Sequence, residues 1–318
     1  MSTGIEQQAF QGENHGHASS QAFEVHLPGP LDIPASLELF RSNGDDLMDR
    51  WDGATLIRTL PVGTQSIAYA CTVRGTTEEP SLQVVLEDTR WKSQVEQAIL
   101  TMFVHPPASF VRLLQTDLVI AQLEKNYPGL RPVLQFDLFA ALVRSISAQQ
   151  VNLRWATTTR RRLAEVFGEK HLVNGQAVYS LNANRLAAVS PADIRALQFT
   201  TRKAEYIIGV AKVIANGDLS LADLALLSNE EVIERLTSLR GIGRWTAEWL
   251  LARTFGRPCV VAGDLAIRKA VGSAYLGTSF PSEQEVRERT AHWGSSAGIA
   301  QVLLLRGWSH TTPSVGAQ

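Results

Sequence analysis

The sequence predicts an α+β fold in which an N-terminal antiparallel sheet domain is followed by an all-α domain. Between residues 23 and 88, short apolar runs alternate with Gly, Pro, Asn and Asp, a pattern typical of strands joined by tight turns. After residue 88 the apolar residues recur with a helical period. The net charge also differs between the two parts of the chain: residues 1–129 carry 8 Lys+Arg and 16 Asp+Glu, whereas residues 130–318 carry 22 Lys+Arg and 15 Asp+Glu. We therefore expect a tail at 1–22, an N-terminal domain at 23–129 and a helical domain at 130–318.

In the N-terminal domain we expect strands at 23–27, 56–60, 66–73 and 82–86. A turn at Pro61, Val62 and Gly63 separates two of them, and a helix at 33–40 interrupts the series. Linking helices follow at 93–102 and 110–126. Residues 1–22 have neither a basic start nor an apolar run, so we expect a floppy tail and not a signal peptide.

Helical periodicity then continues to the end of the chain, without a return to strand patterns. Ser190, Ser228 and Ser282 each precede a helix as capping residues, with carboxylates in its first turn. The expected helices span residues 136–148, 152–167, 182–189, 191–197, 200–215, 229–239, 244–255, 265–276, 282–292 and 296–305.

Composition excludes several classes of protein. The two cysteines, Cys71 and Cys259, are too few for a disulfide framework or for the four thiolates of an iron–sulfur cluster. No apolar run has the length of a membrane span, so we expect a cytoplasmic protein without membrane contact. The excess of basic residues after residue 129 suggests a polyanionic partner, although an uneven solvated surface would give the same count.

The segment 229–270 carries the chemistry. Gly241, Ile242 and Gly243 join two predicted helices, and glycine lets backbone amides at a helix N-terminus point outward at a phosphate. A dinucleotide-binding loop is disfavoured because residue 246 is Thr and a helix, not a strand, precedes the turn. An ordinary helical hairpin with a glycine cap remains an alternative. Further along, Asp264 begins another helix, either as a simple N-cap or as a reactive carboxylate.

These residues resemble the helix-hairpin-helix DNA glycosylases. Residues 239–246 (LRGIGRWT), followed by Asp264 19 residues after Trp245, are similar to the hairpin and catalytic aspartate of that family, and most similar to its 3-methyladenine DNA glycosylase II branch. Residues 139–151 (FAALVRSISAQQV), 306–308 and 58–63 extend the resemblance to roughly residues 23–308.

The resemblance implies a role for each motif. A base inside a duplex must be flipped out, and a wedge fills the gap that it leaves; here Gln149 and Gln150 occupy the wedge loop, with Gln150 in place of an apolar residue. The base pocket would use aromatic faces against a cationic alkylated purine. The implied base-pocket residues are Trp245, Trp249 and, in place of a third aromatic, Leu303; the implied phosphate-binding residues are Gly241, Ile242, Gly243, Arg244 and Thr246.

Asp264 is the implied catalytic carboxylate, which would stabilise an oxocarbenium-like sugar and orient the attacking water. The resemblance also implies that the backbone carbonyls of Thr237, Leu239 and Ile242 hold a monovalent cation, with no other cofactor required. Strand-nicking relatives carry a lysine at the fourth position after the first hairpin glycine, where this chain has Trp245.

We therefore expect a monomeric, monofunctional DNA glycosylase of base excision repair that hydrolyses the N-glycosidic bond of alkylated purines, of the 3-methyladenine and 7-methylguanine type, in double-stranded DNA. Two alternatives remain. One is a bifunctional oxidised-base glycosylase with lyase activity, and the other is a catalytically silent protein that binds damaged DNA. An Asp264 carboxylate that is only a buried cap would favour the silent protein.

Overall fold

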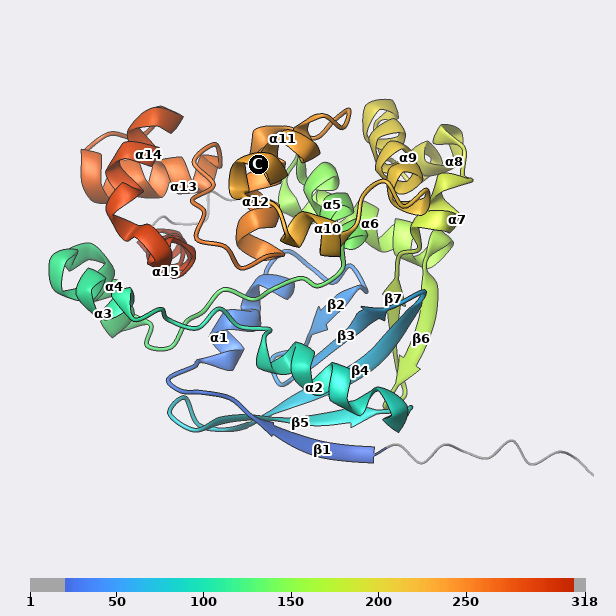
Figure 1. The fold of residues 1–318 in the computed structure, drawn as a ribbon, viewed down its shortest axis with the longest axis horizontal. Helices are drawn as coiled ribbons and strands as arrows, with labels where there is room; N and C mark the ends of the chain where they lie inside the picture. Colours follow the sequence, from blue (N-terminus) through green and yellow to red (C-terminus); the bar gives the residue numbers. More distant parts are fainter. Residues whose placement is uncertain (1–20, 312–318) are drawn as a thin grey trace, which may run out of the picture.

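A computed structural model describes residues 21–311 and confirms the predicted combination of a sheet domain and a helical domain (Figure 1). The antiparallel sheet has the strand order β1-β5-β4-β3-β2. Most of the predicted tail lies outside the described residues, but Gln21 and Ala22 already belong to the first strand. The strands are β1 Gln21–His26, β2 Asp49–Trp51, β3 Thr55–Val62, β4 Gln65–Gly75 and β5 Pro80–Leu86.

Alternating residues of the strands face opposite sides of the sheet. Leu56 of β3 and Tyr69 of β4 face one side, where they pack with α1 (Ile33–Leu37) and α2 (Lys92–Leu100) in one apolar core. Ile57 and Ala70, their neighbours along the strands, face the other side. The predicted turn is shorter than expected, because Pro61 and Val62 continue β3 and pair with Ser66 and Gln65 of β4.

The second side of the sheet is covered by a hairpin that the periodicity did not predict. Strands β6 (Glu169–Val173) and β7 (Gln176–Ser180) interrupt the helical domain. Their turn, Asn174–Gly175, has positive φ at both residues (50° and 72°), the conformation for which Asn-Gly is favoured. Val173 and Val178 of the hairpin are completely buried against Ile57 and Ala70. The expectation of helices alone after residue 88 is therefore wrong.

The main helical bundle packs around a single apolar core above the sheet (Figure 1). Ser190 and Ser228 form the predicted capping boxes at the starts of α8 and α11. The bundle consists of α5 Leu138–Ala148, α6 Leu153–Phe167, α7 Ala183–Ala187, α8 Pro191–Ala196, α9 Thr201–Ala215, α10 Leu221–Ala225, α11 Asn229–Thr237 and α12 Arg244–Arg253.

A second helical cluster combines elements from both sides of the predicted boundary at residue 129. Phe110 and Ile120 are buried with Trp293 and Leu303 in one apolar core, so the second predicted linking helix packs with the helical part, whereas the first, α2, packs on the sheet. The predicted helix at 110–126 breaks at Asp117, whose carboxylate caps the second half. The cluster consists of α3 Ser109–Thr116, α4 Leu118–Asn126, α13 Leu265–Val271, a π-helical turn Gly272–Leu276, α14 Glu283–Thr290 and α15 Ala297–Thr311.

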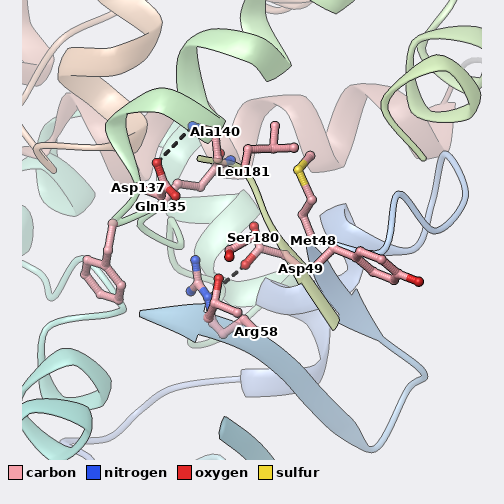
Figure 2. Close-up of a pocket in the computed structure, with 11 residues that line it drawn as sticks. Met48, Asp49, Arg58, Gln135, Asp137, Ala140, Ser180 and Leu181 are labelled. Carbon is pink, nitrogen blue, oxygen red and sulfur yellow. Dashed lines mark hydrogen bonds and ion pairs between the residues drawn. The ribbon is translucent and has the colours of Figure 1, made fainter. Parts of the chain in front are cut away.

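Charged side chains join the sheet domain to the bundle. Arg58 Nε of β3 lies 2.8 Å from Asp49 Oδ1, and Figure 2 shows this pair beside a small cavity that Asp137 of the bundle also lines. Arg144 of α5 pairs with Asp49 and with Asp46 of the segment before β2. Because these groups are mostly withdrawn from water, removing one partner of such a pair typically costs about 3–5 kcal/mol. None of the helices in the described residues is both long and apolar enough to cross a membrane.

Candidate active site and DNA-binding hairpin

The predicted glycine hairpin joins α11 to α12. Gly241 has a φ of +90°, and a Cβ atom at this position would lie 2.2 Å from the ring of Tyr206, so the site requires glycine for two independent reasons. Gly243 is the N-cap of α12, is exposed, and leaves the N-terminus of this helix without a side-chain cap. The hairpin thus presents the positive end of a helix dipole with backbone amides to solvent, which is a surface suited to phosphate.

The hairpin is held against α5 by polar contacts on both of its sides. Gln149 Nε2 donates a 3.0 Å hydrogen bond to the carbonyl of Gly241, and the hydroxyl of Ser145 donates to Thr246 Oγ1 at 2.8 Å. Thr246 and Ile242 are 1% and 4% exposed, so their side chains anchor the hairpin. The expected phosphate contacts of these two residues would therefore be made by their backbone groups, and they stay a prediction.

Arg244 is the exposed side chain of the hairpin. Its Nε atom lies 2.8 Å from Oε1 of Glu248, and Nη2 of Arg287 in α14 lies at the same distance from that oxygen. Glu248 is almost completely buried, so this carboxylate fixes both guanidinium groups beside the hairpin. Sequence patterns did not reveal the contact between Glu248 and Arg287, because these residues are far apart in the chain.

Asp264 is both a helix cap and an accessible carboxylate. Its Oδ1 atom accepts hydrogen bonds from the amides of Ala266 and Ile267, at 2.9 and 3.1 Å, at the start of α13. Its Oδ2 atom accepts a hydrogen bond from the indole Nε1 of Trp245, at 3.1 Å. The residue is only partly buried. The two roles considered from the sequence are therefore compatible, since capping uses one oxygen and leaves the other on the side of Trp245.

Asp264 also lies within the electrostatic reach of a cation. Burial lowers the pKa of Arg253 in α12, and the negative charge of Asp264 opposes that shift. The carboxylate is thus oriented by three hydrogen-bond donors in the presence of a guanidinium charge. Such an arrangement fixes the direction of a carboxylate, as stabilisation of a nearby positive charge requires.

The three predicted base-pocket residues have different surroundings. Trp245 and Trp249 lie one turn apart on α12 and are both half-buried. Trp245 turns its indole nitrogen to Asp264, whereas Trp249 packs against the core of the bundle. Leu303 has no exposed surface and lies in the core between α4, α13 and α15. This differs from the expectation that Leu303 lines an open base pocket, because apolar neighbours cover the face of α15 on which Leu303 lies.

The two predicted wedge residues have different surroundings: Gln149 is bonded to the hairpin, and Gln150 is exposed. Gln149 is bonded to the hairpin, as described above, and ends α5 as its C-cap. Gln150 is exposed and has a φ of +54°, in the left-handed region that side chains rarely adopt. The loop therefore projects one side chain, that of Gln150, away from the protein.

In the described residues, no group of three or more His, Cys, Asp or Glu side chains could hold a metal ion. The carbonyls of Thr237, Leu239 and Ile242 are neutral oxygen donors in one short turn, and that of Leu239 already accepts a hydrogen bond from the amide of Ile242. A second lone pair remains on this oxygen, so the donor set is compatible with a weakly bound monovalent cation.

The fold and the hairpin are those of a base excision repair glycosylase. Residues 143–295 match the model of the HhH-GPD superfamily base excision DNA repair proteins, so this part of the chain is an HhH-GPD domain. It is 24% identical to a DNA-3-methyladenine glycosylase of Bacillus subtilis over 91% of this chain and 98% of the relative. It is 30% identical to a putative DNA-3-methyladenine glycosylase of the same organism over 57% of this chain and 63% of the relative.

The solved structure of a 3-methyladenine DNA glycosylase from Archaeoglobus fulgidus has the same fold. It superimposes with a TM-score of 0.80 at 23% identity, covering 92% of this chain and all of the other. The family assignment from the hairpin and Asp264 is thereby confirmed, and so is the combination of an N-terminal sheet domain with a helical domain.

Proposed function

We propose that this protein is a monofunctional DNA glycosylase that flips alkylated purines out of double-stranded DNA and hydrolyses their N-glycosidic bond. The observation that carries the proposal is the Asp264 carboxylate, capped through Oδ1 and bonded by Trp245 through Oδ2. As the bond to a cationic base breaks, the sugar acquires positive charge, which the fixed carboxylate stabilises. The same group can orient or deprotonate the water that completes hydrolysis.

The other residues supply binding and flipping. The hairpin amides around Gly243 hold a phosphate, which fixes the position of the backbone without reading sequence. The side chain of Gln150 enters the DNA duplex at the place that the flipped base has left, and its amide can hydrogen-bond the unpaired base of the opposite strand. The indole of Trp245 offers a face to a cationic purine while its edge holds Asp264.

Water is proposed as the nucleophile because the chain has no amine at the position that a lyase would use. That position is Trp245, and an indole cannot form a Schiff base. The nearest lysine in sequence to Asp264 is Lys269, which is exposed on α13. The abasic strand should therefore remain intact after the base is released.

The test is incubation of the full chain with duplexes that contain 3-methyladenine or 7-methylguanine, followed by chromatography of the released base. Release of free base without strand scission is the expected result. Sodium borohydride added during the reaction should trap no covalent complex. A trapped complex that disappears when one lysine is replaced would favour the bifunctional alternative, and DNA binding without base release would favour the silent damage-binding protein.

Three further properties belong to the proposal. The enzyme acts as a monomer in the cytoplasm, on the DNA of the nucleoid. A monovalent cation bound by the carbonyls of Thr237, Leu239 and Ile242 would neutralise their dipoles and stiffen the hairpin. Replacing K⁺ by a bulky organic cation at constant ionic strength should then weaken DNA binding.

A further inference from the structure

Hydrogen bonds to Ser147 fix the end of α5 immediately before the wedge loop (148–151), which carries the exposed Gln150. Ser147, in the last turn of α5, accepts a 2.9 Å hydrogen bond on its Oγ from Arg160 Nη1 and donates from the same hydroxyl to the carbonyl of Arg144. The backbone carbonyl of Ser147 accepts from Nζ of Lys203 at 2.8 Å. Carbonyls in the last turn of a helix lack helical partners, so this ammonium satisfies one that would otherwise be free.

Arg160 is in turn held by the sheet domain. This residue lies on α6 and is 8% exposed, and its Nε atom lies 2.9 Å from Oδ2 of Asp46. Asp46 precedes β2 and is 3% exposed. Burial opposes the charged form of Asp46, but the guanidinium groups of Arg144 and Arg160 outweigh it and keep its pKa below the usual value. One carboxylate of the sheet domain therefore fixes two arginines of the bundle.

The contacts form a continuous path from the sheet to the wedge. Asp46 holds Arg160, Arg160 holds Ser147, and the chain then reaches Gln149, which is bonded to the hairpin carbonyl of Gly241. Gln150 lies between these fixed points with its strained left-handed backbone. A residue in a rarely populated conformation persists only where its surroundings impose it.

We infer that Arg160, oriented by Asp46, is a positioning residue for base flipping, and that the sheet domain acts through it to set the direction of Gln150. This inference rests on the proposed function, in which Gln150 is the wedge. It gives the sheet domain a part in the reaction, although the domain contributes none of the proposed catalytic, base-pocket or hairpin residues.

Ser147→Ala is the most selective test. Alanine keeps the helix and the ion pairs, but it removes the only oxygen through which Arg160 Nη1 holds the end of α5 in the described structure. Ser309→Ala is a control for the loss of a serine hydroxyl, because the exposed Ser309 also donates its hydroxyl to the carbonyl three residues earlier, on the distant helix α15. Arg160→Lys is a second variant, in which a single ammonium replaces the fork that reaches Asp46 and Ser147 together.

Each variant is assayed on 7-methylguanine in a duplex and on the same lesion in a single strand, where no pair has to be opened. Fluorescence of a 2-aminopurine beside the lesion reports flipping in the duplex. Loss of one hydrogen bond from a charged donor predicts that excision from the duplex falls roughly tenfold for Ser147→Ala. Excision from the single strand should stay within about twofold, and the fluorescence amplitude should fall.

Two results would overturn the inference. One is an equal loss on duplex and single strand by correctly folded Ser147→Ala and Arg160→Lys, and the other is unchanged excision and flipping on the duplex. Failure of the proposed function looks different, since the unaltered protein would then release no base from either substrate. Ser309→Ala should match the unaltered protein in every assay.

Discussion

The hydrogen bond between Trp245 and Asp264 gives the most informative single substitution, Trp245→Phe. Phenylalanine keeps an aromatic face at this position on α12 but removes the indole N–H that lies 3.1 Å from Asp264 Oδ2. The carboxylate retains its two backbone donors on Oδ1, so its rotamer should persist while Oδ2 loses its only described partner. The variant therefore separates the role of the indole edge from that of the ring face.

The magnitude follows from the type of bond. A hydrogen bond to a charged group contributes about 1.5–3 kcal/mol, which corresponds to roughly 10- to 150-fold in rate if it acts fully in the transition state. Because the two amide bonds to Oδ1 remain, we expect a loss near the lower limit, roughly tenfold in the rate of the chemical step. Affinity for DNA should change little, since the hairpin amides are untouched.

The assay is single-turnover release of 7-methylguanine from a duplex with enzyme in excess, together with the affinity for abasic product DNA. Trp91→Phe, on a half-buried tryptophan of the sheet domain, controls for the general effect of the substitution. A Trp245→Phe rate within twofold of the unaltered protein would refute the role of the indole edge. So would a loss that resides entirely in DNA affinity.

Two further predictions concern the hairpin and the sheet–bundle interface. Gly243→Asp should fold, because Gly243 has an extended φ of −100°, open space around its Cβ position and an N-cap location that favours Asp. It should nevertheless weaken binding to damaged and undamaged DNA alike, by roughly tenfold in filter-binding or anisotropy measurements, whereas Gly243→Ala should bind almost normally. Burial raises the pKa of Asp137, so ionising this group costs stability at neutral pH; the cost begins to decrease as pH falls through the raised pKa and is gone below the ordinary pKa of an aspartate. Asp137→Asn should therefore raise the denaturant midpoint at pH 7 and lose that advantage in acid, and an equal effect at both pH values would contradict the assignment.

The sequence was sufficient for the features that depend on local chemistry. Ser190, Ser228 and Ser282 cap their helices as predicted, and Asp264 caps α13, because each cap is decided within four residues. The hairpin could be identified for the same reason, since the positive φ of Gly241 arises within the turn itself, whereas its close approach to Tyr206 could not be predicted.

Other features depend on partners distant in the chain. The signal for the β6–β7 hairpin was present in Asn174–Gly175, but a short run with few apolar residues was outweighed by the helical periodicity on both sides. The packing of Phe110 and Ile120 against Trp293 joins segments more than 170 residues apart, which no local pattern reveals. The polar contacts of Gln149, Arg160 and Glu248 were hidden for the same reason.

The central claim is that the Asp264 carboxylate carries the chemistry, and Asp264→Asn tests it most directly. Asparagine also caps helices, so Oδ1 can keep its bonds to the amides of Ala266 and Ile267. Its amide nitrogen would then face the N–H of Trp245, donor against donor, at a modest cost in stability. The charge that stabilises the sugar cation is lost, which is typically worth about 3–4 kcal/mol in the barrier.

The decisive measurement is the single-turnover rate of 7-methylguanine release by Asp264→Asn, with its affinity for the same duplex measured in parallel. We predict a fall of roughly 100- to 1000-fold in the rate with affinity unchanged. A folded variant that releases the base at close to the normal rate would show that Asp264 is only a helix cap, and the catalytic assignment would be wrong.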